Sequence, residues 1–174
     1  MRNVEIKAKV HDMEAICQIA ESLSGTKPTI IQQDDTFYKV NSGRLKLRVY
    51  ADESATLVRY DRDDEQGPKL CDYDLLQFSV DEKEKARLLN NMLLKCLGIR
   101  GRVVKERKLY MVGQTRLHID TVQDLGSFME LEVVLRPEQT TEEGQAVAHD
   151  LQEKLGVKNA DLIDCAYVDL LDKK

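Results

Sequence analysis

The sequence predicts an α+β fold: an eight-stranded antiparallel β-barrel or tunnel with helices packed on its outside. Two observations lead to this prediction. Eight segments alternate between apolar and polar residues, which is the period of a β-strand, and four others have the apolar period of an amphipathic helix. So many short strands in 174 residues favour a closed barrel braced by helices, and we expect one domain spanning residues 1–174.

The predicted strands follow one another along the chain and are separated by turn signals. They are residues 3–10, 33–40, 44–50, 56–62, 73–80, 102–112, 115–122 and 128–136. The sequences NSG before Arg44 and VGQ before Thr115 are typical of tight turns between antiparallel strands. The sequence DRDDEQGPK at 61–69 predicts a longer, mobile loop.

Four segments have helical periodicity: residues 12–23, 81–97, 140–155 and 160–172. Asp81 and either Thr140 or Thr141 are suited to cap the second and third helices at their N-termini. Gly98 and Gly156 are suited to end the same two helices.

Composition excludes several classes of partner. The net charge of −5 argues against bulk electrostatic binding to nucleic acid or to an anionic membrane. No apolar run is long enough to cross a bilayer, and MRNVEIKAKV at the N-terminus lacks the pattern of a signal peptide. The four cysteines form no CxxC pair, which favours a reducing compartment. We expect a cytoplasmic monomer or homodimer.

Nearly every predicted strand has one ionisable face. The residues in this phase are Glu5, Lys7 and Lys9; Arg44, Lys46 and Arg48; Tyr60 and Arg62; Lys105 and Arg107; Arg116, His118 and Asp120; and Glu130 and Glu132. A half-solvated sheet is the simpler interpretation, but such a face usually mixes charges with Thr, Ser and Gln. Cations crowd residues 44–48 and 105–107, so neighbouring strands would repel without a bound counter-ion. This favours a liganded face.

If the charged faces turn into the barrel, its interior is a wet channel lined by cations, with carboxylates to one side. Such a channel suits a polyanion together with a divalent metal. Mg²⁺ and Mn²⁺ prefer carboxylate oxygens and water, and Arg and Lys bind phosphate oxygens. Phosphoryl chemistry depends mainly on positioning and charge neutralisation, so it requires no nucleophilic side chain.

NVEIKAKV at 3–10 resembles the ExExK signature of the CYTH superfamily, the triphosphate tunnel metalloenzymes, which includes class IV adenylate cyclases and thiamine triphosphatases. The resemblance continues through QDDTFYKVNSGRLKLR, LVRYDR, VVKERKLY and TRLHIDTVQDLGSFMELEVV. The resemblance covers nearly the whole chain, with the motifs in the same order. It is closest to the cyclase-like branch of the superfamily. It implies an eight-stranded tunnel that binds a triphosphate-containing small molecule with Mg²⁺ or Mn²⁺.

The resemblance also implies roles for individual residues. The metal-binding acids would be Glu5, Asp120, Glu130 and Glu132. The phosphate-binding cations would be Lys46, Arg48, Arg62, Lys105, Arg107 and Arg116, to which we add Lys9 and Arg44 near the tunnel mouths. Lys7 and Glu5 match the end of the signature and are candidate catalytic residues, with Lys7 as a proton relay.

Some positions depart from the family pattern or remain open. Asn3 stands where the signature has its first Glu, and it offers a metal an uncharged carbonyl oxygen. His118 has the phase of the site but could serve only as a hydrogen-bonding partner. The sequence does not decide whether Asp34 and Asp35 cap a strand or belong to the site. Arg59 has the opposite phase to Arg62 and is left out.

Three functions are compatible with these residues. The leading one is metal-dependent hydrolysis of inorganic or organic triphosphates. The second is a class IV adenylate cyclase, which converts ATP to cyclic AMP and pyrophosphate with the same cations and metals. The third is a non-catalytic module that binds polyphosphate.

Overall fold

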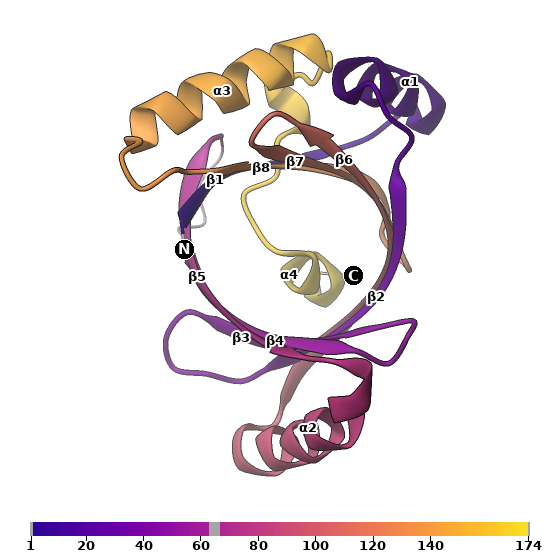
Figure 1. Cartoon of the computed structure of the whole chain (residues 1–174), viewed down its shortest axis with the longest axis vertical. Coiled ribbons are helices and arrows are strands. Elements are labelled where there is room, and N and C mark those ends of the chain that lie inside the picture. The colour runs from indigo at the N-terminus through magenta and orange to yellow at the C-terminus, as the bar shows by residue number, and fades with distance from the viewer. Residues whose placement is uncertain (1, 63–66, 174) are drawn as a thin grey trace.

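The protein forms a closed antiparallel barrel of eight strands (Figure 1). The computed structural model describes residues 2–62 and 67–173. Around the barrel the strands follow the order β1-β5-β4-β3-β2-β6-β7-β8. Their bounds are β1 (Arg2–Lys9), β2 (Thr29–Tyr38), β3 (Arg44–Tyr50), β4 (Ala55–Arg62), β5 (Lys69–Phe78), β6 (Ile99–Val112), β7 (Thr115–Val122) and β8 (Gly126–Val134). The predicted barrel with outside helices is confirmed.

Several strands are longer than their alternating segments predict. β2 begins at Thr29 and β5 at Lys69, each four residues earlier than predicted. The reason is pairing, because Thr29 lies opposite Leu109 of β6 and Lys69 lies opposite Glu5 of β1. Hydrogen bonds to a neighbouring strand extend a strand beyond the stretch in which its side chains alternate. Of the predicted loop at 61–69, residues 63–66 lie outside the described residues.

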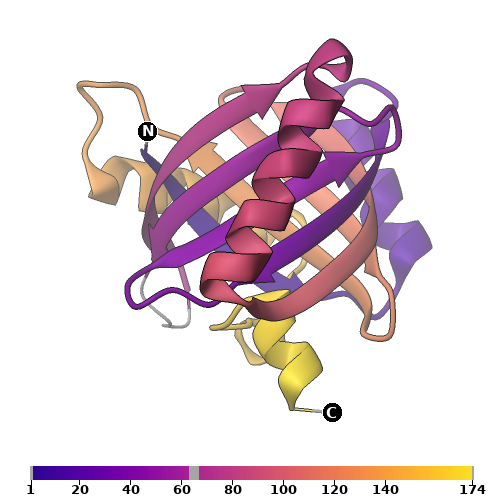
Figure 2. The same cartoon turned by 90° about the horizontal axis from the view of Figure 1, so that it is seen from below.

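Three helices cover the outer wall of the barrel: α1 (Met13–Ser24), α2 (Lys83–Leu97) and α3 (Thr141–Lys154) (Figures 1 and 2). Thr140 caps α3 as predicted, since its side chain accepts a hydrogen bond from the Glu143 backbone at 3.2 Å. The prediction for Asp81 is wrong. This residue lies inside a 3₁₀ turn (Val80–Glu82) that precedes α2.

The predicted helix over 160–172 is also wrong in most of its length. A 3₁₀ turn (Asn159–Asp161) is followed by extended chain, and only the short helix α4 (Tyr167–Asp172) remains. The extended part adds to the edge of β1, where the Ile163 backbone N–H donates to the Lys7 carbonyl at 2.8 Å. This pairing overrides the helical period and brings α4 to one end of the barrel, where it is seen inside the ring of strands in Figure 1 and protruding from that end in Figure 2.

The main hydrophobic core lies outside the barrel, between the sheet and the helices. Val4, Ile6 and Ala8 of β1 are fully buried there, in one cluster with residues of α1 and α3. Helix α3 approaches closely because Gly144 has no side chain, and a Cβ at this position would lie 2.8 Å from a methyl of Val4. With the apolar faces turned outward, the charged faces of the strands turn into the lumen.

Among the described residues, no helix combines the length and the hydropathy needed to cross a lipid bilayer.

Candidate active site

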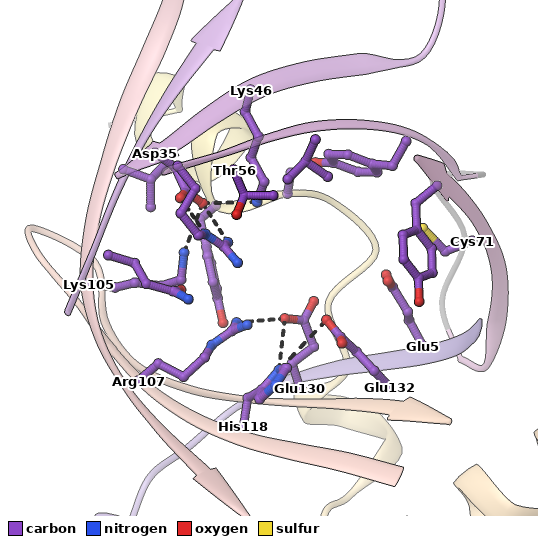
Figure 3. A pocket seen from close by; sticks show the side chains of 18 of the residues that line it. Glu5, Asp35, Lys46, Thr56, Cys71, Lys105, Arg107, His118, Glu130 and Glu132 are labelled. Atoms are coloured by element: carbon purple, nitrogen blue, oxygen red, sulfur yellow. Dashed lines mark hydrogen bonds and ion pairs between the residues drawn. The ribbon is translucent and has the colours of Figure 1, made fainter. Parts of the chain in front are cut away.

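The lumen holds a cavity of about 270 Å³ that every strand helps to line (Figure 3). Antiparallel register places the charged residues of neighbouring strands side by side. On β1 and β8, Lys7 lies opposite Glu130 and Glu5 lies opposite Glu132. The predicted face therefore does line an enclosed space, and the half-solvated sheet is excluded for these strands.

On one side of the cavity, three cations surround the carboxylate of Asp35, and we call these four residues the Asp35 cluster. Lys46 Nζ lies 2.9 Å from this carboxylate, and Lys105 Nζ lies 3.0 Å from it. Arg48 binds both of its oxygens, from Nε at 2.7 Å and from Nη2 at 2.8 Å. Only 1 % of the Asp35 side chain is exposed. Three cations share one acid, so the cluster carries an excess of positive charge.

The charges of the Asp35 cluster shift one another's pKa values. Burial by itself would raise the pKa of Asp35, but Arg48, Lys105 and Lys46 outweigh it and hold this pKa well below the usual value. Burial lowers the pKa of Lys105 to about 7, and the neighbouring cations Arg48 and Lys46 contribute in the same direction. Lys105 is thus poised to gain or lose a proton near neutral pH.

Across the lumen lies a second set of residues, His118, Glu130 and Glu132, which we call the acidic group (Figure 3). One potential ligand atom from each lies within 4.8 Å of the others. Burial would raise the pKa of Glu130, but Lys7, His118 and Arg107 hold it well below its ordinary value. Glu130 is therefore a carboxylate at neutral pH, with Lys7 Nζ at 3.3 Å and Arg107 Nη2 at 2.8 Å.

Glu5 and Asn3 border the acidic group from β1. Arg62 Nη1 donates to Glu5 at 2.9 Å. Burial, together with Glu130 and Glu132, raises the pKa of Glu5. The two other nitrogens of the buried Arg62 guanidinium have no hydrogen-bond partner. The Oδ1 atom of Asn3 is likewise buried and unpartnered, and the Asn3 side chain lines the cavity.

These residues fit a divalent metal. The His118 Nδ1 atom is buried without a hydrogen-bond partner, 3.8 Å from Glu130 and 3.7 Å from Glu132. A cation between them would satisfy this nitrogen and offset the charge of the two carboxylates. Carboxylate oxygens with one imidazole suit Mn²⁺ and, through the oxygens, Mg²⁺. The orphaned Asn3 carbonyl oxygen is a further donor.

Asp120, a predicted metal ligand, lies behind the residues that line the cavity, on the far side of Arg107. Its carboxylate accepts two hydrogen bonds from Arg107, and it accepts a third from the Tyr167 hydroxyl at 2.9 Å. Its side chain is fully buried, and it is not among the described residues that line the cavity. In this structure Asp120 holds Arg107 and α4 in place.

Of the predicted cations, six line the cavity: Lys46, Arg48, Arg62, Lys105, Arg107 and Arg116. Arg116 pairs there with Glu132, through Nε at 2.7 Å. Two lie elsewhere. Lys9 is exposed at the end of β1, and Arg44 lies in a separate cleft beside α4, where it binds Asp169 at 3.3 Å. Arg59, left out for its phase, is on the outer surface beside Asp72.

Several of the cations expected to repel one another without a ligand have counter-ions within the protein, and repulsion remains in the Asp35 cluster, where Arg48 and Lys46 help to lower the pKa of Lys105. Arg107 binds Asp120 and Glu130, and Arg116 binds Glu132. The Asp35 carboxylate neutralises part of the remaining excess. The lumen therefore contains its own counter-ions, arranged so that the surplus of positive charge remains in the Asp35 cluster.

Two important lumen residues have little signal in the sequence. Asp34 and Asp35 are adjacent, so either could face inward, and pairing with Arg48 of β3 settles the choice for Asp35. Tyr167 comes from the segment that was expected to be helical throughout. Its ring lies 4.4 Å from Lys7 Nζ, where it closes one end of the cavity.

Comparison with solved structures shows the same fold in several proteins. The PH1012 protein of Pyrococcus horikoshii has a TM-score of 0.79 at 24% identity, covering 97% of this chain and 98% of that one. A conserved protein of Pyrococcus furiosus has a TM-score of 0.77 at 19% identity, with 97% and 99% covered. A proposed adenylate cyclase from Vibrio parahaemolyticus has a TM-score of 0.73 at 16% identity, with 98% and 97% covered.

Comparison with curated proteins finds no match. The sequence does match a family model, that of the CYTH domain, over residues 1–167. This match spans all eight strands of the barrel, the Asp35 cluster and the acidic group. The protein therefore belongs to the CYTH domain family.

Proposed function

We propose that this protein is a metal-dependent triphosphatase that hydrolyses inorganic or organic triphosphates inside the barrel. One observation carries the proposal: the positively charged Asp35 cluster lies across an enclosed lumen from the acidic group. A polyanion held by the first and a divalent cation held by the second would meet between them. CYTH proteins typically act on triphosphates and depend on metal, which agrees with this pairing.

The phosphate groups would be bound by the cations whose N–H donors are not all used by carboxylates of the protein. Lys46, Arg48 and Lys105 share a single carboxylate, so each can turn a hydrogen bond toward a phosphate oxygen. The unpartnered Nε and Nη2 atoms of Arg62 add a guanidinium edge on the other side of the lumen. Inside a largely enclosed cavity these charge-assisted bonds are stronger than on a surface.

Glu130, Glu132 and His118 would hold Mg²⁺ or Mn²⁺, with Glu5 and Asn3 beside them. When bound, the metal would neutralise phosphate oxygens and activate water. The protein's own groups position the triphosphate and exclude solvent from one end, where Tyr167 of α4 covers the lumen. The Lys105 ammonium group, with a pKa near 7, can hold a proton beside the phosphate oxygens. We therefore assign proton donation to Lys105, and Lys7 pairs with Glu130 of the acidic group.

Cyclisation of ATP is the second candidate. The same cations and metal would serve attack by a ribose hydroxyl on the α-phosphorus. Tyr50 and Leu75 line the cavity beyond the phosphate-binding cations and could accommodate a nucleoside, which is the observation in favour of this reaction.

The test is to incubate the purified protein with inorganic triphosphate and with ATP, each with Mg²⁺ or Mn²⁺, and to resolve the products. Orthophosphate supports the triphosphatase, cyclic AMP with pyrophosphate supports the cyclase, and binding without turnover supports the non-catalytic module. Lys105→Met should abolish turnover. Lys108→Met is the matched control, since Lys108 lies on the same strand with its side chain outside the lumen, near Cys17.

A further inference from the structure

Helix α2 has one face that the rest of the described chain leaves uncovered. Its other face packs on the barrel, where Ala86 is buried and Leu93 joins a cluster with Tyr38 and Leu47. Figure 1 shows α2 on the wall of the barrel away from α1 and α3, and in Figure 2 it lies in front of the strands that it crosses. The outward face of such a helix normally carries polar and charged residues.

The outward face of α2 is instead apolar at its centre. Leu88 is 61% exposed and Met92 is 56% exposed. They are one helical turn apart, and the exposed Cys96 follows one turn later, so the three side chains form a row along the helix that we call the α2 stripe. Single exposed apolar residues are common, but large ones that adjoin each other gain free energy when they are covered together.

Opposite charges lie near the two ends of the α2 stripe. Glu84 is one turn before Leu88, and Lys95 precedes Cys96. Positions 84 and 95 are about three helical turns apart, so both side chains lie on the same flank of the stripe. Glu84 binds Arg87 of its own helix at 2.7 Å, but 74% of its side chain is exposed, so it can also reach a second cation.

A second copy of α2 that runs in the opposite direction complements this pattern. A two-fold axis near position 90 would bring Leu88 against Met92 of the partner subunit, and the reverse. The same axis would place Glu84 beside Lys95 of the partner subunit, and would do so twice. In a parallel pair each charge would meet its own copy and be repelled. The apolar and the charged residues of this face therefore both fit the same face of a second copy.

We propose that the protein forms a homodimer in which the outward face of α2 packs antiparallel against α2 of a second copy. The interface is essentially one pair of helices, smaller than the roughly 1,600 Å² of a standard interface, so the dimer is weak and depends on concentration. Because α2 lies on the side wall of the barrel, dimerisation leaves the two ends of the lumen as they are in the monomer (Figure 1). The inference does not depend on the reaction that takes place in the lumen.

Sedimentation velocity over a concentration series up to about 300 μM tests the association, since a small interface binds weakly. The wild type should change from monomer to dimer within this series. Met92→Glu should weaken the association about tenfold or more, because it places a charge in the apolar centre of the interface. Met111→Glu is the matched control, since Met111 is 49% exposed at the end of β6 that is far from α2, and it should have no effect.

A charge exchange tests the direction of the pairing. Glu84→Lys should weaken the association about fivefold, because two attractive contacts become repulsive. Adding Lys95→Glu to the same chain should restore the wild-type association, since both contacts are then attractive again with their signs reversed. A double variant that associates no better than Glu84→Lys alone would overturn the antiparallel pairing.

Cross-linking with a short bis-maleimide tests the register. Lys85 and Cys96 lie about three turns apart on the other flank of α2, so Lys85→Cys should give a covalent dimer through Cys96 of the partner subunit. Lys85→Cys combined with Cys96→Ser should give none. The wild type should give none either, because its two Cys96 side chains would be about 18 Å apart along the antiparallel pair. Wild-type cross-linking through Cys96, a protein that stays monomeric throughout the series, or a dimer that Met92→Glu does not weaken would each overturn the proposal.

Discussion

The guanidinium of Arg107 binds the carboxylate of Asp120 with two hydrogen bonds, from Nε at 2.7 Å and from Nη2 at 2.6 Å. The same Nη2 atom lies 2.8 Å from Glu130, and the Tyr167 hydroxyl reaches Asp120 from α4. One buried cation thus joins β6, β7 and β8 and, through Asp120, the helix that covers one end of the barrel. It serves the structure as well as the charge of the lumen.

Arg107→Met should therefore destabilise the protein. Removing one partner of a buried ion pair costs about 3–5 kcal/mol, because the remaining charge stays buried without compensation. Urea denaturation measures this change. Arg59→Met is the control, since Arg59 lies on the outer face with acids 3.4–3.9 Å away, and its loss should cost less than about 1 kcal/mol. Adding Asp120→Asn to Arg107→Met should restore part of the stability. If Arg107→Met and Arg59→Met were equally stable, this account of Arg107 would be contradicted.

Asp35→Asn should lower the melting temperature of the ligand-free protein and enlarge the increase caused by inorganic triphosphate. The substitution leaves Lys46, Arg48 and Lys105 without their shared counter-ion, so a bound anion takes over that role. Ligand stabilisation follows RT ln(1 + [L]/Kd), so tighter binding appears directly as a larger shift. Asp34→Asn is the control, because Asp34 pairs with Arg102 outside the lumen. A smaller triphosphate shift in Asp35→Asn than in the wild type would refute the role given to Asp35.

Glu132→Gln should weaken Mn²⁺ binding by about tenfold or more, since losing even an outer partner of a metal site costs about 10–100-fold. His118→Leu should have a similar effect if its unpartnered Nδ1 is a ligand. Electron paramagnetic resonance of free Mn²⁺ gives the affinity without requiring activity. Asp74→Asn, on the outer face with 78% of its side chain exposed, is the control. Wild-type affinity in both lumen variants would place the metal elsewhere.

Asn3→Glu should tighten Mn²⁺ binding by about tenfold, or about 1.4 kcal/mol, because it adds a charged oxygen ligand beside the acidic group. Asn3 is 2% exposed, so in EDTA the new charge should also lower the melting temperature. The Asn3→Gln variant has a side chain as long as that of Asn3→Glu but without the charge, so it separates the effect of side-chain length from the effect of charge. No difference between the Glu and Gln variants in Mn²⁺ affinity would show that position 3 does not reach the metal.

Lys105 should couple triphosphate binding to proton uptake. Its pKa is lowered to about 7 by burial, so above that pH the folded protein binds fewer protons at this residue than the unfolded chain does. This residue therefore makes stability rise with pH between about 7 and the ordinary lysine pKa of about 10.4. A phosphate ligand favours the charged form, so binding takes up a proton, and affinity falls as pH rises above about 7.

Calorimetry at pH 8 in two buffers of different ionisation enthalpy measures this uptake. Lys105→Arg should reduce it, since a guanidinium stays charged throughout this range, and Lys108→Arg should not. An enthalpy that does not depend on the buffer in the wild type would rule out the coupling.

The alternation of apolar and charged residues is enough to predict the barrel and the inward face of most strands. This works because a strand has a period of two, so neighbours in sequence determine which side chains share a face. Lys46 and Arg48 on β3, and Glu130 and Glu132 on β8, are found in the lumen as this rule predicts. The rule says nothing of strand ends, and for that reason it also includes Lys9, which is exposed.

Only the tertiary structure decides which charge meets which. The choice of Asp35 over Asp34, the position of Asp120 behind Arg107 and the arrival of Tyr167 in the lumen all depend on contacts between residues far apart in sequence. The extended chain before α4 likewise forms because β1 offers it a carbonyl to bind. Local pattern determines the face on which a side chain lies, but the pairing of buried charges depends on the closure of the barrel, which brings distant strands within hydrogen-bonding distance.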